Sequence, residues 1–204
     1  MKHVLARPLV QVISVIVIVL IAIPASAQLT VEQKLFDFEN LAATYARRYA
    51  PYEWKRDFLG FDLLQIGPWL DRVARSSDDL EFYEIMLEYV ASLEDTHSSF
   101  SVPSSFFADL GFFVDIYDNR VLIESVNRIR LPVQQYPFQI GDELISVDGS
   151  PVDSLMTEFS RFTKRGSPVA TRRTVADFLT RRAQSRLPRV VDLGDQAVVV
   201  IARQ

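Results

Sequence analysis

Two stretches decide the fold of this chain, ADLGFFVDIY at residues 108–117 and IGDELISVDG at residues 140–149. In the first, Gly111 lies between large apolar residues and leads directly into the alternating pattern of a strand. A turn at this point presents backbone N–H groups at the start of a strand, and such groups can hold a carboxylate. In the second stretch, a strand pattern is followed by Asp148-Gly149, a pair typical of a tight β-hairpin turn.

Further strands and helices are predicted around these two stretches. Residues 112–117 and 121–126 are expected to form two strands joined across Asp118-Asn119-Arg120, because such residues tolerate the left-handed backbone of short turns. The remaining elements expected from the spacing of apolar residues are strands at 141–147 and 197–202 and helices at 152–162 and 170–182.

Three amphipathic helices are predicted before these strands, and together they can share one small core. Thr30 is expected to cap the first helix, with Gln33 reaching back to complete a capping box. An irregular stretch is expected at residues 50–55. The other two helices are expected over 63–73, with an interruption at Gly67-Pro68, and from a cap within 76–79 to about Leu93.

The first 27 residues have the pattern of a secretory signal peptide. A positively charged start precedes an apolar run of 15 residues, 9–23, which ends in Ala25-Ser26-Ala27 before Gln28. The run is shorter than the roughly 20 residues that cross a bilayer, so cleavage before Gln28 is predicted rather than a retained anchor. The protein is therefore expected to be exported, to the periplasm or the extracellular space, with membrane contact only through an uncleaved signal segment.

The composition excludes several kinds of site. The sequence contains no cysteine, and His97 is the only histidine after residue 27. Disulfide-stabilised folds, thiolate zinc sites and cysteine nucleophiles are thus excluded. The acidic spacing of a calcium-binding loop is also missing, so no metal and no cofactor are expected.

Charge is distributed unevenly along the chain. Residues 28–160 carry 23 acidic and 10 basic side chains, whereas residues 161–189 carry 9 basic side chains and Asp177 as their one acidic residue. This asymmetry predicts that the late segment faces an acidic surface, which belongs either to the first half of the chain or to a partner. Nucleic acid is not expected as that partner, because the chain is predicted to be exported.

The order of these parts resembles the front half of the S41 peptidases, which are the C-terminal processing and tricorn-core-like serine peptidases. The segment Leu93-Glu94-Asp95-Thr96-His97-Ser98 is similar to the Leu-x-Asp-x-His-[Ser/Thr] turn of that family. Asp109-Leu110-Gly111-Phe112 fits the carboxylate-binding loop of a PDZ domain, and residues 141–149 fit its strand-turn unit. The resemblance covers residues 29–204. It implies an α+β chain with a three-helix domain at 28–103 and a PDZ-like, partly open β-barrel with flanking helices at 104–204.

The resemblance implies that the PDZ-like part binds the C-termini of protein substrates. Leu110, Gly111, Phe112 and Phe113 would grip the terminal carboxylate through their backbone amides, while the peptide adds as a strand beside residues 112–116. The helix at 152–162 or the helix after it would form the other wall of the groove. The alternative is an ordinary loop that enters a strand, in which Gly111 serves only a positive φ angle.

The resemblance also implies a role for His97 as the general base of a serine peptidase. In the family, the nucleophilic serine lies in a domain after the PDZ domain, and these 204 residues do not contain that domain. The chain is therefore expected to be a truncated or fragmentary member that is inactive alone. A free-standing PDZ adaptor without a protease partner is the alternative function.

Two other interpretations of these residues remain open. His97 can instead be an imidazole that stabilises its turn. A catalytic site assembled locally would need Ser98 or Ser99 beside His97, or Ser160 paired with Lys164 four residues later. Neighbouring side chains on a loop rarely meet at the geometry of a nucleophile and its base, and no oxyanion donor accompanies Ser98 or Ser99. Lys164 lies among other cationic residues, where nothing is expected to lower its pKa, so neither local site is favoured.

Overall fold

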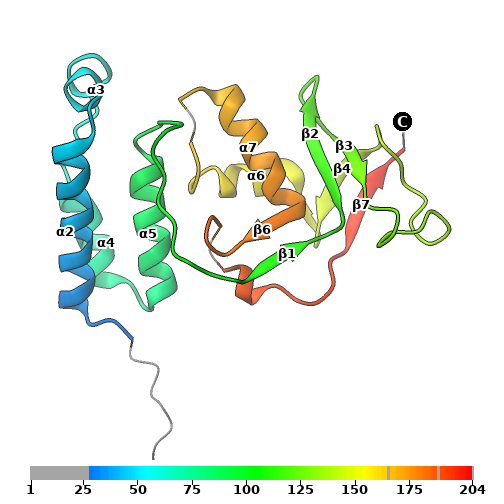
Figure 1. Ribbon diagram of the computed structural model, residues 1–204, viewed down its shortest axis with the longest axis horizontal. Coiled ribbons are helices and arrows are strands. Elements are labelled where there is room, and N and C mark those ends of the chain that lie inside the picture. The colour runs from blue at the N-terminus through cyan, green and yellow to red at the C-terminus, as the bar shows by residue number, and fades with distance from the viewer. Residues whose placement is uncertain (1–27, 165, 188, 204) are drawn as a thin grey trace, which may run out of the picture.

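The computed structural model describes residues 28–164, 166–187 and 189–203. It consists of a helical unit that lies beside a unit of strands and helices (Figure 1). Each unit has its own hydrophobic core. The α+β fold class is confirmed, and within the described residues the strands form two open sheets rather than a closed barrel. The predicted signal peptide, residues 1–27, lies outside the described residues.

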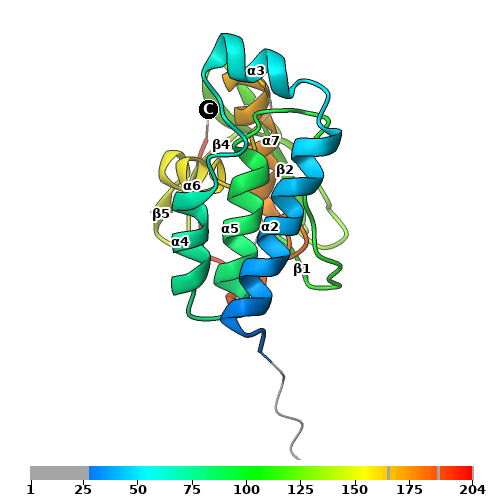
Figure 2. The ribbon, with the colours of Figure 1, turned by 90° about the vertical axis from the view of Figure 1, so that its left-hand side faces the viewer.

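The helical unit contains the three predicted helices, α2 (Val31–Arg48), α4 (Gly67–Arg75) and α5 (Asp79–Ala91). They run alongside one another in Figure 2. The capping box predicted at Thr30 is present, and the N-cap of α5 is Asp78, whose carboxylate accepts a hydrogen bond from the N–H of Glu81. The core of the unit is aromatic, with the rings of Phe38 and Tyr89 in edge contact at a centroid separation of 4.9 Å.

The sequence interpretation missed one helix of this unit. Residues 50–55 were expected to be irregular, but α3 (Tyr52–Leu59) begins within them and ends at Gly60, which has a φ angle of 64°. The second predicted helix is also shorter than expected. It begins at Gly67 because Pro68 occupies its first turn, where the missing N–H group of proline costs nothing.

The second unit is built on a five-stranded sheet. Its strands are β2 (Phe112–Tyr117), β3 (Arg120–Val126), β4 (Glu143–Val147), β5 (Ser150–Pro151) and β7 (Val199–Ala202). β2 lies at one edge, β3 joins it to β4, and β7 also pairs with β4. The two hairpin turns predicted from sequence are confirmed. Their residues have positive φ angles, 48° and 64° at Asp118-Asn119 and 51° and 77° at Asp148-Gly149.

Two helices cover this sheet, α6 (Val152–Phe159) and α7 (Pro168–Thr180). Val175, Phe178 and Leu179 of α7 are buried against the sheet, and α7 packs directly on β2. Of the two helices that were considered for the second wall of a groove, α7 is therefore the one beside β2. The chain also forms a short antiparallel pair, β1 (Phe107–Asp109) with β6 (Arg181–Ala183), which the sequence interpretation had missed.

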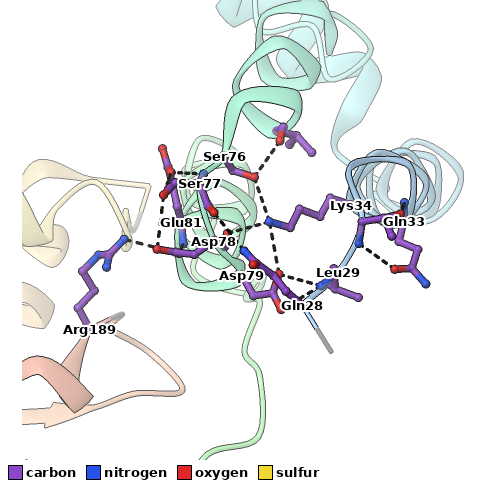
Figure 3. A network of polar contacts seen from close by, with 12 residues as sticks. Gln28, Leu29, Gln33, Lys34, Ser76, Ser77, Asp78, Asp79, Glu81 and Arg189 are labelled. Carbon is purple, nitrogen blue, oxygen red and sulfur yellow. Dashed lines mark hydrogen bonds and ion pairs between the residues drawn. The ribbon is translucent and has the colours of Figure 1, made fainter. Parts of the chain in front are cut away.

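The start of the described chain is tied to α5 by a polar network (Figure 3). The N–H of Leu29 donates to both carboxylate oxygens of Asp79 at 3.2 Å. The ammonium group of Lys34, whose residue is only 2% exposed, pairs with Asp79 at 3.3 Å and donates to the carbonyl of Asp78 at 3.0 Å. A buried lysine is tolerated here because it is paired and hydrogen-bonded.

The late basic segment faces acidic side chains of the helical unit. Arg189 pairs with Glu84 at 2.6 Å. Arg189 also reaches Asp78 at 3.9 Å (Figure 3). Among the described residues, the units are also joined by the ion pairs of Arg161 with Glu88, and of Lys164 with Glu94 at 3.2 Å. Of the two alternatives for the acidic surface, the structure thus provides one within the chain's own first half. Among the described helices, none is both long and apolar enough to cross a membrane.

Candidate functional site

The turn that carries His97 begins where α5 ends. Glu94 takes a φ angle of 48°, which turns the chain away from the helix axis. Asp95 then folds back, and its carboxylate accepts a hydrogen bond from the backbone N–H of His97 at 2.8 Å. This bond holds the pKa of Asp95 below its ordinary value, against the opposing effect of partial burial. Asp95 therefore fixes the turn, and it does so through the backbone of His97 rather than through the imidazole.

Lys55 of α3 stabilises the same turn. Its ammonium group donates to the carbonyl oxygen of Leu93 and, at 3.4 Å, to that of Glu94. Lys55 is only 8% exposed, and it satisfies carbonyls at the C-terminal end of α5, where a positive charge is favourable. Sequence reasoning missed this residue because it lies on α3, in a stretch that was expected to be irregular.

The side chain of His97 is exposed and lines a cavity of about 380 Å³. Tyr45 of α2, the C-cap residue Tyr49 and Ser98 also line this cavity. Burial raises the pKa of Tyr49, and the neighbouring Asp95 carboxylate adds to this effect. The imidazole is thus presented to solvent on a fixed turn, in reach of a group that enters the cavity.

The second local site that was considered, Ser160 with Lys164, is not on a helix. α6 ends at Phe159. The hydroxyl of Ser160 donates to the carbonyl of Thr157 at 2.7 Å, and Lys164 pairs with Glu94 at 3.2 Å. Both groups are engaged with other partners, so the spacing of four residues does not bring a hydroxyl and an amine together here.

The predicted carboxylate-binding loop lies between β1 and β2. Gly111 has a φ angle of 84°, and a Cβ atom at this position would lie 3.2 Å from the side chain of Leu131, so both backbone and space favour glycine. Two of the amides expected to grip a ligand already have partners. The N–H of Leu110 donates to the carbonyl of Thr180 at 3.0 Å, and the N–H of Gly111 donates to the carboxylate of Asp109 at 2.5 Å.

The two phenylalanines of the predicted loop point to different surroundings. Phe112 is 2% exposed and packs in the core of the sheet unit, with its ring 5.2 Å from that of Phe138. Phe113 lies under the guanidinium of Arg181, which is 4.6 Å from the ring centroid. Phe112 therefore anchors the start of β2, while Phe113 contacts the first residue of β6.

Two ion pairs surround this loop. Arg130 pairs with the carboxylate of Asp109 at 3.3 Å and donates to its carbonyl at 2.8 Å. Arg173 of α7 binds Asp115 of β2 through two nitrogens, with the Nε–Oδ1 distance at 3.0 Å. The bond from Arg173 holds the pKa of Asp115 below its ordinary value. Sequence reasoning gave no signal for either pair, since the partners are 21 and 58 residues apart.

His97 and the carboxylate-binding loop do not share a cavity. Asp109 and Leu110 line a separate space of about 300 Å³, between β1, the end of α7 and residues 190–197. In the part of the chain that the structure describes, no group of three or more histidine and carboxylate side chains is placed to hold a metal ion. The two predicted sites are thus distinct in space, one on the helical unit and one on the sheet unit.

Comparison with known families identifies the sheet unit. The PDZ domain family matches residues 107–204, so the chain contains a PDZ domain. The matched residues include the loop at Gly111, the edge strand β2 and the helix α7 that packs on it.

Related chains are known from chlamydiae. An uncharacterised protein of Chlamydia muridarum is 27% identical over 128 residues, which are 61% of this chain and 20% of that protein. A protein of Chlamydia trachomatis serovar D is 23% identical over 146 residues, covering 68% and 23% of the two chains. This chain therefore spans about a fifth of the length of the curated relatives it matches.

Solved structures of CPAF have the same fold over most of this chain. The crystal structure of mature CPAF matches with a TM-score of 0.66 and 21% identity, and that of a CPAF mutant with a TM-score of 0.65 and 21% identity. Each match covers 85% of this chain and 34% of the CPAF chain. The similarity extends beyond the PDZ domain, so it includes part of the helical unit.

Proposed function

We propose that this chain is the helical and PDZ portion of an exported serine peptidase of the S41 type. Its PDZ domain binds the C-termini of unstructured polypeptides, and a catalytic domain outside these residues cuts them. PDZ domains in general bind peptide C-termini by adding the peptide as a strand to a sheet edge. The chain alone, in this proposal, binds peptides and does not hydrolyse them.

One observation carries the proposal most strongly. The chain combines a PDZ domain with a preceding helical unit, and the two together share their fold with about a third of the CPAF chain. An isolated PDZ adaptor would not need the helical unit, whereas the resemblance to S41 peptidases includes both. The Asp95-Thr96-His97 turn at the end of the helical unit supports the same assignment, because its imidazole is exposed on a fixed backbone.

His97 has a defined role in this proposal. A histidine that acts as general base must be neutral, and its imidazole must lie within hydrogen-bond reach of the serine hydroxyl that it deprotonates. The cavity of about 380 Å³ beside His97 leaves the imidazole accessible to a serine from another domain. Asp95 and Lys55 would then act as positioning residues, because they hold the turn and not the imidazole.

Peptide binding tests the proposal directly. The purified protein would be titrated with a library of fluorescent decapeptides that end in a free carboxylate, each matched by the same peptide with an amidated C-terminus. Binding that requires the free carboxylate is the expected result. Equal binding of the free and amidated forms would contradict C-terminal recognition.

Hydrolysis is the second measurement. The same peptides, followed by mass spectrometry, should remain intact in the presence of this chain. Turnover by the chain that is lost in His97→Ala would show instead that a complete catalytic site is assembled within these residues. Peptide binding by His97→Ala should equal that of the unchanged protein, because His97 and the PDZ loop line different cavities.

A further inference from the structure

The carboxylate-binding loop already holds a carboxylate, and it belongs to the chain itself. The Asp109 side chain accepts the N–H of Gly111 at 2.5 Å, and this is one of the amides that would receive the terminal carboxylate of a peptide. Arg130 pairs with the same Asp109 carboxylate, and Leu131 lies against Gly111. The loop is thus filled by the same chemical group that it would take from a ligand, complete with a cationic partner.

The neighbouring amide is occupied from the other side. The N–H of Leu110 donates to the carbonyl of Thr180, the last residue of α7. This bond joins the loop to the helix that forms the second wall of the groove. A peptide that used the Leu110 amide would have to compete with the backbone of α7.

The edge of β2 is also covered. Among the described strands, β2 pairs with β3 alone, so its other edge is the place where a peptide strand would add. The two-nitrogen contact of Arg173 with Asp115 ties α7 to that edge, and Asp115 is only 8% exposed. A peptide strand lies about 4.8 Å from its neighbour, so it cannot enter while this contact holds α7 against β2.

We propose that the structure is the closed state of a self-inhibited peptide site, in which the Asp109 carboxylate stands where a ligand's terminal carboxylate docks. Opening requires Asp109 to leave the Gly111 amide and Arg173 to part from Asp115. Arg130, released from Asp109, then pairs with the carboxylate of the peptide. This inference rests on the proposed function, and it names how the same site is regulated.

A closed state weakens apparent affinity by the fraction of molecules that are open at equilibrium. Asp109→Ala removes the internal carboxylate and leaves both the Gly111 amide and Arg130 available. Apparent affinity for free-carboxylate peptides should therefore rise by about twofold, because the contacts that close the loop are exposed and individually weak. Asp109→Asn should give a smaller rise, because its amide oxygen can still accept from Gly111 but cannot pair with Arg130 as an anion.

The experiment is a titration of the decapeptide library into four proteins, with circular dichroism as the test of folding. They are the unchanged protein, Asp109→Ala, Asp109→Ala with Arg130→Gln, and Asp71→Ala. Asp71 is an exposed aspartate on α4, so its variant has the charge change of Asp109→Ala without touching the site. Only Asp109→Ala should bind more tightly, and adding Arg130→Gln should remove most of that gain for free carboxylates while leaving the amidated peptides unchanged.

Each other outcome has a defined meaning. Equal, carboxylate-dependent binding by the unchanged protein and Asp109→Ala would overturn self-inhibition and leave C-terminal recognition standing. No binding by any variant would overturn both. Should Asp109→Ala fail to fold, the double variant Asp115→Asn with Arg173→Gln tests the second closing contact without leaving an unpaired charge. Unaltered affinity in that folded double variant would also overturn the inference.

Discussion

Two turns in this molecule are built on the same local bond and serve different ends. In each, an aspartate carboxylate accepts the backbone N–H of the residue two positions later, Asp95 from His97 at 2.8 Å and Asp109 from Gly111 at 2.5 Å. The first turn leaves an imidazole exposed. The second uses up the amide on which its predicted function depends. The same bond therefore has opposite effects in the two turns. It leaves the side chain of His97 accessible, but it engages the backbone N–H of Gly111 that a ligand would need.

The two turns also differ in how they are anchored. Lys55 holds the peptide carbonyls before Asp95 and is nearly buried, whereas Arg130 holds Asp109 with a side chain that is 53% exposed. A buried charge with hydrogen-bonded partners is costly to remove, while an exposed ion pair contributes little. The first turn is thus expected to be part of the stable fold, and the second is expected to open at low cost.

The largest effect is expected from removing the buried anchor. Lys55→Met should lower the free energy of unfolding by about 2 kcal/mol, because carbonyls at the end of α5 lose their donor in a site with little access to water. Urea denaturation measures this value. Arg56→Met, on the exposed side of the same helix, is the matched control and should leave the free energy of unfolding nearly unchanged. An equal decrease in the free energy of unfolding in the two variants would contradict the proposal that Lys55 anchors this turn.

The ion pair that closes the groove should have a smaller and pH-dependent effect. Arg173→Gln is expected to lower the free energy of unfolding at neutral pH by less than Lys55→Met does, because Asp115 keeps its charge at a poorly exposed position without its partner. Arg173 holds the pKa of Asp115 below its value in the unfolded chain. The stability from this pair is therefore present above about pH 4 and lost as the pH falls further through the folded pKa.

Denaturation of both proteins over a range of pH tests this sign. The difference in unfolding free energy between the unchanged protein and Arg173→Gln should be constant from pH 6 to 7 and should shrink in more acidic solution. A difference that grows as the pH falls would contradict the assigned direction of the pKa shift.

The two aspartates themselves give the most direct comparison of the turns. Asp95→Ala should cost about 1 kcal/mol, since it removes the carboxylate that accepts the backbone N–H of His97. Asp109→Ala should cost about 0.5 kcal/mol or less, because its ion pair is exposed and water can reach the loop. Thermal and urea unfolding of the pair measure both values. A larger loss for Asp109→Ala would mean that the second turn is as rigid as the first.

The smallest effect is expected at His97 itself. His97→Ala should change the free energy of unfolding by less than about 0.5 kcal/mol, because its side chain is exposed and the turn is held by Asp95 and Lys55. Urea denaturation checks this value. A loss above about 1 kcal/mol would instead favour the interpretation of His97 as an imidazole that stabilises its turn.

Much of the fold was predictable from the sequence because it rests on local patterns. Thr30 with Gln33 marked the first helix, and Asp118-Asn119 and Asp148-Gly149 marked the hairpins through their tolerance of positive φ angles. The helix α3 was missed because its eight residues, between Pro51 and Gly60, are too few to show a clear apolar period. β1 and β6 were missed because a three-residue strand carries almost no pattern, and its partner lies more than 70 residues away.

The chemistry of the two sites was less predictable. The residues Asp95, His97, Leu110 and Gly111 could be selected from short motifs, since each motif is continuous in sequence. The contacts that decide their state could not. Lys55 reaches Leu93 across 38 residues and Arg173 reaches Asp115 across 58, so that whether the site is open or closed is set by tertiary packing.

The seam between the two units has a consequence for how the molecule responds to its surroundings. Arg161, Lys164 and Arg189 reach across it to carboxylates, and all three side chains are at least two-fifths exposed. The Debye screening length falls from about 8 Å at physiological ionic strength to about 3 Å at 1 M, so concentrated salt weakens these exposed contacts, while apolar cores are not weakened in this way. At high salt the two units should therefore move more freely relative to each other before either unit unfolds. Small-angle X-ray scattering should detect this as a change in the radius of gyration, whereas a thermal melt should not.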